Sequence, residues 1–122
     1  MESEKIRIGK FIIGLCDRTA AGKIKWANIT PEVFFTEVKN IRVCLSVRET
    51  ESFDDVDYIA KFLSLPENDV IFEYTDVDLK DIMPRSYSTM RELYQQARLS
   101  AFGYKSKLDE ALDDFLEDDS DE

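Results

Sequence analysis

Apolar residues recur at spacings of three and four over residues 4–21, a period that is typical of an amphipathic helix. Gly22 is suited to the position just after a helix end, where the backbone turns left-handed. Gly9 and Gly14 oppose a helix, because glycine costs about 1 kcal/mol in a helix interior relative to alanine. A strand over residues 6–15 is therefore the alternative interpretation, and we expect the helix.

From Lys23 the period of the apolar residues changes to two. Residues 23–26 alternate as a half-buried strand does. Residues 33–48 predict an antiparallel hairpin that turns at Lys39-Asn40 and has one covered face. Its second half alternates most cleanly, with Ile41, Val43, Leu45 and Val47 on one side and Arg42, Cys44, Ser46 and Arg48 on the other.

Further along, two apolar runs flank the turn-rich residues 66–69 and predict a second hairpin. The first run, residues 58–65, also fits the period of a short helix, so both interpretations stand. The acidic residues 49–57 are expected to form an exposed loop, and residues 75–85 a connection.

The C-terminal third carries one apolar stripe at helical spacing over residues 89–115, about 40 Å of helix. Thr89 and Glu92 have the spacing of a capping box at its start. Gly103 is the one break in the stripe, and it marks a bend or the close approach of another element.

The order helix, about five strands, helix predicts an α+β fold with two layers. An antiparallel sheet with one apolar face needs cover, which an N-terminal and a long C-terminal helix on that face supply. The length of 122 residues fits a single domain, expected over residues 1–116, with an acidic C-terminal tail over residues 117–122. We expect Trp26, Leu45 and Leu93 to share one core.

The net charge of −10 is concentrated at the C-terminal end, where residues 109–122 hold nine acids and no base. Residues 1–108 are nearly neutral, with 17 acids and 16 bases. Such a distribution argues against binding to nucleic acid and favours a basic protein partner steered by the acidic end. Glu117, Asp118 and Asp119 are the candidate binding residues there. The alternative is that the run only keeps the chain in solution.

The absence of histidine excludes Ser-His-Asp and Cys-His catalysis and any histidine-ligated metal site. The acids of residues 49–57 and 76–81 lack the spacing of a calcium-binding loop, so we expect neither a metal nor a cofactor. Cys16 and Cys44 are expected to be reduced, buried thiols rather than a disulfide. Neither a signal peptide nor a membrane-spanning run is recognisable, so a cytoplasmic location with no membrane partner is expected.

One cluster on the C-terminal helix has the residue types of an anion site. Tyr94 and Arg98 lie one turn apart with Arg91 nearby, and together they have the groups to hold a phosphate or a carboxylate. The alternative is structural, with Tyr94 in the core and its hydroxyl at the boundary, and with Arg98 over the sheet edge or paired with an acid.

Two segments carry a resemblance to known proteins. Residues 19–26 form a Thr-x-x-Gly-Lys-x-x-Trp passage, and residues 93–101 form a Leu-Tyr-x-x-Ala-Arg helix that an acidic Leu-Asp-x-x-Leu end follows at residues 108–112. This layout resembles small uncharacterised bacterial α+β proteins, often associated with mobile elements or defence. The resemblance implies no catalytic residue.

The sequence therefore favours a small cytoplasmic protein-binding domain, an inhibitor or immunity-type antagonist of a basic protein, over an enzyme. One alternative is a ligand-binding protein or enzyme that uses the Tyr94/Arg98 region. Another is an acidic DNA-mimic antagonist, which the nearly neutral residues 1–108 weaken. The oligomeric state stays open.

Overall fold

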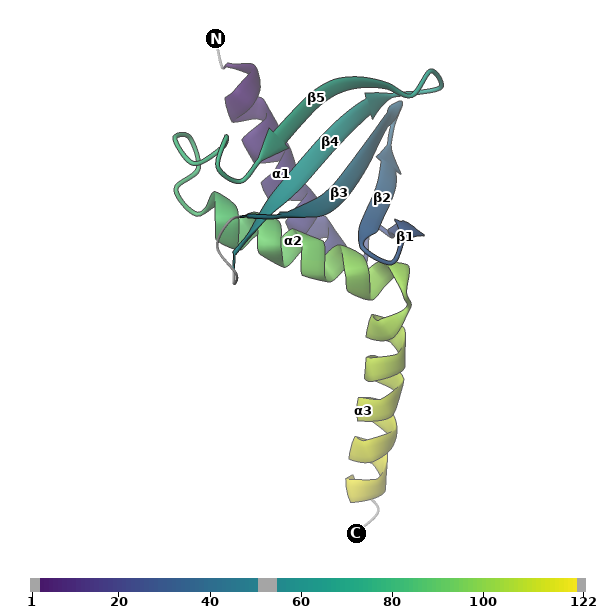
Figure 1. The fold of residues 1–122 in the computed structure, drawn as a ribbon. Helices are drawn as coiled ribbons and strands as arrows, with labels where there is room; N and C mark the ends of the chain where they lie inside the picture. The colour runs from purple at the N-terminus through teal and green to yellow at the C-terminus, as the bar shows by residue number, and fades with distance from the viewer. Residues whose placement is uncertain (1–2, 51–54, 121–122) are drawn as a thin grey trace.

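A computed structural model describes residues 3–50 and 55–120, with the backbone alone for residues 105–106 and 118–120. It shows an α+β fold with an N-terminal helix, a five-stranded sheet and two C-terminal helices (Figure 1). The elements are α1 (Glu4–Ala20), β1 (Ala27–Thr30), β2 (Val33–Val38), β3 (Ile41–Glu49), β4 (Val56–Ser64), β5 (Asp69–Thr75), α2 (Ser86–Ala101) and α3 (Tyr104–Ser120).

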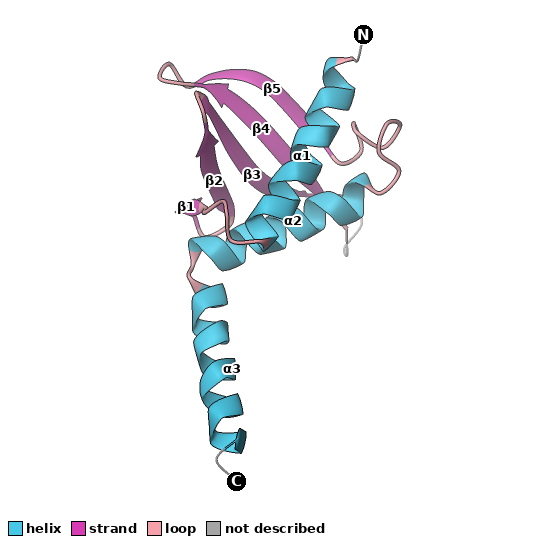
Figure 2. Cartoon of the chain, turned by 180° about the vertical axis from the view of Figure 1, so that it is seen from behind, coloured by secondary structure: helices cyan, strands magenta, loops and turns pink. Residues whose placement is uncertain are grey.

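The five strands form an antiparallel meander in the order β1-β2-β3-β4-β5. Figure 2 shows α1 and α2 crossing each other on the same side of this sheet. The predicted α+β fold is thus confirmed, as are both hairpins. Residues 58–64 belong to β4, which rules out the helical alternative for that run.

The N-terminal helix is also confirmed, in place of the strand over residues 6–15. The Ser3 hydroxyl caps α1 by accepting a hydrogen bond from the Ile6 amide at 3.2 Å. Gly22 follows the helix end with φ +77°, a conformation that glycine adopts without steric cost.

One hydrophobic core lies between the sheet and the two helices that cover it. Trp26, Leu45 and Leu93 all belong to it, with exposed fractions of 5%, 2% and 0%, as predicted. Other fully buried members come from α1, from β2 and from α2, namely Ile12, Phe34, Met90 and Ala97.

The strand predicted over residues 23–26 is wrong, because β1 begins only at Ala27. The backbone there is paired with side chains instead of a neighbouring strand. The Trp26 amide donates to the Ser100 hydroxyl at 2.9 Å, and the Lys25 carbonyl accepts from the Thr36 hydroxyl at 2.8 Å. The Trp26 indole donates to the Thr19 hydroxyl at 2.9 Å, so this residue links α1, α2 and the start of the sheet.

The loop expected over residues 49–57 is shorter than predicted. Glu49 ends β3, and Val56 and Asp57 begin β4. Arg48 of β3 lies opposite Asp57 of β4, and the two side chains form an ion pair at 2.9 Å. One acid of the predicted loop therefore joins β4 to β3. Residues 51–54 lie outside the described part of the chain.

The predicted capping box is also wrong, since α2 begins at Ser86 and Thr89 lies inside the helix. The buried Ser86 hydroxyl donates to the Asp76 carbonyl at 2.6 Å, which ties the helix start to the end of the sheet. The Asp76 carboxylate in turn accepts from the Tyr58 amide at 2.8 Å. These buried contacts, rather than a local cap, set where α2 starts.

The single long C-terminal helix is divided in two at Gly103, which has φ +69°. A residue in this left-handed region interrupts the helical hydrogen bonding and redirects the chain. Figures 1 and 2 both show α3 extending away from the sheet and from the other helices. The backbone of residues 117–120 continues α3, so the predicted tail begins inside a helix.

We predict that Leu93→Ala lowers the free energy of unfolding by about 2–5 kcal/mol, because it opens a cavity in a fully buried site. Leu108→Ala is the matched control, since Leu108 lies in α3 and is exposed. Urea denaturation followed by circular dichroism measures both variants. Equal stability of the two variants would show that Leu93 does not face the core.

Candidate functional site

The most distinctive surface of the molecule is an apolar face of α3 that no described part of the chain covers. Four large apolar residues form it, and we call them the α3 stripe: Leu108, Leu112, Phe115 and Leu116, with exposed fractions of 55%, 48%, 67% and 61%. Their spacings of four, three and one place them on one side of the helix. The prediction that residues 108–115 face the core is therefore wrong, because the turn at Gly103 carries them away from it.

The opposite side of α3 is acidic. Its described, exposed acids are Asp109, Glu110, Asp113, Asp114 and Glu117. The backbone places Asp118 and Asp119 in the last turn of the helix, and their side chains lie outside the described part of the structure. Of the predicted acidic binding residues, Glu117 is thus shown on the surface of a helix rather than in an extended tail.

The charges of α3 do not stabilise it as an isolated helix. Acids near a helix C-terminus interact unfavourably with the helix dipole, and the last turn of α3 has no base. An isolated helix of 17 residues is also close to the shortest length that is stable in water.

Aromatic side chains pack at the start of α3, where it follows α2. Phe102 packs edge-on against Phe34 with ring centroids 5.7 Å apart, and Tyr104 lies 5.4 Å from Phe102. The Arg98 guanidinium lies 5.8 Å from the centroids of both Phe102 and Tyr104. Arg98, one of the predicted anion-binding residues, therefore contributes to the bend between α2 and α3.

Tyr94, the second residue of the predicted anion site, has a structural partner. Its hydroxyl donates to the Glu32 carbonyl at 2.6 Å, and its ring packs against Phe34 and Tyr58 at 5.2 and 5.6 Å. Burial, followed by the Glu32 charge, raises the pKa of the Tyr94 hydroxyl, which therefore stays a neutral donor. Its hydrogen bond joins α2 to the turn between β1 and β2.

Arg91, the third predicted residue, is exposed on α2. Burial raises the pKa of the nearby Tyr58 hydroxyl, and the Arg91 charge opposes this shift. The structure thus places the three residues along one helix but gives Tyr94 and Arg98 contacts within the fold.

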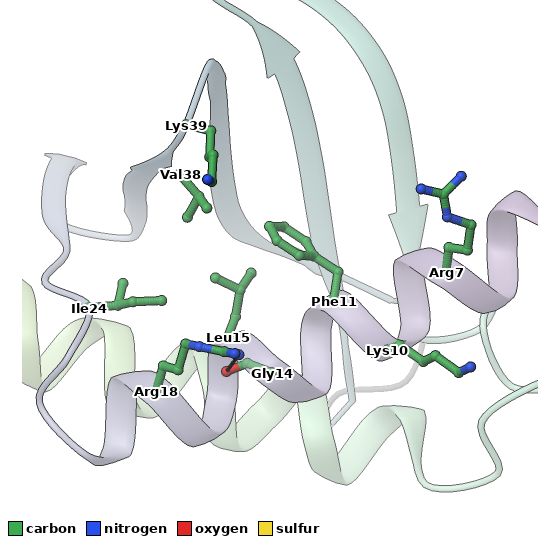
Figure 3. Close-up of a pocket in the computed structure, with 9 residues that line it drawn as sticks. All are labelled: Arg7, Lys10, Phe11, Gly14, Leu15, Arg18, Ile24, Val38 and Lys39. Carbon is green, nitrogen blue, oxygen red and sulfur yellow. Dashed lines mark hydrogen bonds between the residues drawn. The ribbon is translucent and has the colours of Figure 1, made fainter.

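A second surface, which the sequence analysis did not single out, is a groove beside α1 with a volume of about 560 Å³ (Figure 3). We call it the α1 groove. Its apolar lining is Phe11, Leu15, Ile24 and Val38, and its bases are Arg7, Lys10, Arg18 and Lys39. Among the described residues that line it there is no acid. The groove is thus apolar and basic, the reverse of α3 in charge.

A signal for this groove was present in the sequence. Arg7, Phe11, Gly14 and Arg18 follow one another at spacings of four, three and four, which places them on one side of a helix. Two residues that complete the groove, Val38 at the end of β2 and Lys39 in the turn after it, are distant in sequence, so only the fold brings them to this helix.

The two cysteines are free thiols. Cys16 is buried in α1, and burial raises its pKa to about 11. Cys44 is only half-buried, contrary to expectation, because it lies on the outer face of β3 with Arg42. Burial also raises the pKa of Cys44, while the charges of Arg42 and Lys61 oppose the shift.

The described residues contain neither a metal-binding cluster nor a membrane-spanning helix. No group of three or more potential ligand side chains lies close enough together there to hold a metal ion. Over the same residues, no helix combines the length and the apolar character needed to cross a membrane.

We predict that Tyr94→Phe lowers the free energy of unfolding by about 0.5–1.5 kcal/mol, because the Glu32 carbonyl loses its donor. Tyr104→Phe, at an exposed tyrosine of α3, serves as the control and should have no effect on urea unfolding. If inorganic phosphate raised the melting temperature of the parent chain but not of Tyr94→Phe, the hydroxyl would be an anion ligand and the structural interpretation would fail.

Comparison with protein-family models, with curated proteins and with solved structures found no match to this chain. The resemblance to small bacterial α+β proteins accordingly stays a prediction carried by residues 19–26, 93–101 and 108–112.

Proposed function

We propose that this chain is a small protein-binding protein that uses α3 as a docking helix and acts as an inhibitor or antagonist of a basic protein. The observation that carries the proposal is the exposed α3 stripe on a helix that extends away from the body of the fold. Apolar side chains of this size are normally buried, and a contiguous exposed set of them marks an interaction surface.

The chemistry of α3 specifies what its partner must offer. An amphipathic helix docks by laying its apolar side into a hydrophobic groove, with anchors at the spacing that Leu108, Leu112 and Phe115 have. The acids on the other side of α3 favour a groove flanked by lysine and arginine. Because these acids are exposed, they increase the rate of association more than they hold the complex together.

Two observations support docking over the alternative of a ligand site or enzyme at Tyr94 and Arg98. The Tyr94 hydroxyl is already hydrogen-bonded to Glu32, and Arg98 lies against two aromatic rings. The free thiols are compatible with the reducing cytoplasm in which we place the protein. The nearly neutral residues 1–108 still argue against a DNA mimic.

The proposal is tested with a synthetic helical peptide that carries leucine on one side and lysine on the other, labelled for fluorescence anisotropy. We predict that the chain binds this peptide and that Leu112→Gln with Phe115→Gln weakens binding at least about tenfold, which is about 1.4 kcal/mol. Ile29→Gln with Val77→Gln is the matched control, because both residues are exposed but lie outside α3.

The acids are tested by stopped-flow association with the same peptide. Asp109→Asn with Asp113→Asn should slow association at low salt, and the difference should shrink as salt screens the charges. Asp17→Asn with Asp69→Asn removes the same charge from other exposed positions and should have a smaller effect.

Equal affinity of the parent chain and the Leu112/Phe115 variant for the peptide would contradict a docking role for α3.

A further inference from the structure

We propose that a second copy of this chain is a partner of α3: the α3 stripe of each copy docks in the α1 groove of the other, and the two copies form a symmetric dimer. The inference rests on the proposed function, because it takes α3 to be a docking helix and names one protein that fits it. It goes further in assigning a role to the α1 groove.

The α3 stripe and the α1 groove are both apolar, and the acids of α3 are opposite in charge to the bases of the groove. The α1 groove has the apolar floor and the basic rim that the docking of α3 requires, with Phe11 and Leu15 below and Arg7, Arg18 and Lys39 around them. Figure 3 shows Phe11 and Leu15 pointing from α1 toward the strand end that carries Val38. At about 100° per residue, Asp109 borders the α3 stripe and would lie nearest these bases, while the acids on the far side of α3 would add a longer-range attraction, so docking would join surfaces of opposite charge.

The α3 stripe is short enough to lie within the groove. From Arg7 to Arg18 the α1 groove follows 11 residue steps of helix, about 17 Å at the rise of an α-helix. From Leu108 to Leu116 the α3 stripe covers 8 steps, about 12 Å. The whole α3 stripe can thus lie along the groove.

Gly14 has no side chain that would fill the space above α1 in the groove. Arg18 folds along α1 and donates from Nη1 to the Gly14 carbonyl at 3.2 Å (Figure 3). A side-chain carbon at position 14 would lie 2.7 Å from Arg18 Nη1, so any larger residue would displace this arginine. The glycine therefore holds a base at the rim and leaves room above the helix.

The geometry favours a second copy over two other occupants. The α3 of the same chain leaves the body beyond the end of α2 and points away from α1 in both views (Figures 1 and 2). Pairing of two α3 stripes with each other would bury those residues but would leave the apolar floor of the α1 groove uncovered. Reciprocal exchange of α3 instead uses the same two surfaces on each copy, and such an interface closes at two subunits.

The oligomeric state of the full-length chain, measured by sedimentation equilibrium over a wide concentration range, tests the inference. We predict a dimer whose population rises with concentration. Leu112→Gln with Phe115→Gln, and separately Arg18→Glu with Lys39→Glu, should each give a monomer. Lys23→Glu with Lys80→Glu is the control for charge reversal, because both lysines are exposed and lie outside the α1 groove, and it should stay dimeric. Far-UV circular dichroism checks that each variant folds.

Mixing the two monomeric variants gives the sharper test. The groove variant keeps an intact α3, and the α3 variant keeps an intact groove, so one of the two docking contacts can form between them. We predict a one-to-one complex in the mixture, although each variant alone is monomeric. General damage to the surface would not restore association in this way.

The outcomes separate this inference from the proposed function. If the parent chain is monomeric at every concentration but binds the leucine-lysine peptide through α3, then a second copy is not the partner. The proposed docking role of α3 still holds in that case. A dimer that survives both the Leu112/Phe115 and the Arg18/Lys39 changes overturns the inference, because another surface then holds it. A chain that neither dimerises nor binds the peptide contradicts both.

Discussion

The sheet has one apolar face, and two crossing helices cover it. Met90, Leu93 and Ala97 of α2 are fully buried, while Phe11 of α1 reaches Phe62 of β4 with ring centroids 5.8 Å apart. The other face carries charged pairs such as Arg42 with Glu37 and Lys61 with Glu73, so it needs no cover. Together, α1 and α2 cover the apolar face of the sheet.

The C-terminal element, α3, lies outside this packing of the sheet against α1 and α2. The chain contains a third amphipathic helix, and the left-handed turn at Gly103 directs it into solvent instead of onto the sheet. In the function we propose, a partner outside this chain covers the stripe of large apolar side chains on this helix. The acids of α3 favour a basic partner surface, and we propose the α1 groove of a second copy as that surface.

The sequence predicted most of the helices and strands, but it did not show which of their surfaces are packed against other elements. Period-two alternation placed the first hairpin, because a strand alternates its side chains whatever lies around it. The turn-rich residues 66–69 between two apolar runs placed the second hairpin. The stripe over residues 89–115 was equally clear, but periodicity shows only which side of a helix is apolar and not whether anything packs on it. The hydrogen bond of Trp26 with Ser100, and the meeting of Arg18 with Lys39 at the groove, join residues far apart in sequence and follow only from the fold.

A chain that ends at Gly103 tests whether α3 lies outside the folded core. Urea unfolding, measured at a concentration where the full-length chain is monomeric, gives the free energy of unfolding of both chains. We predict that the two values agree within about 1 kcal/mol, because the exposed residues removed contribute little to the folded state. A shortened chain that is unfolded, or several kcal/mol less stable, would place the α3 stripe in the core and contradict the account.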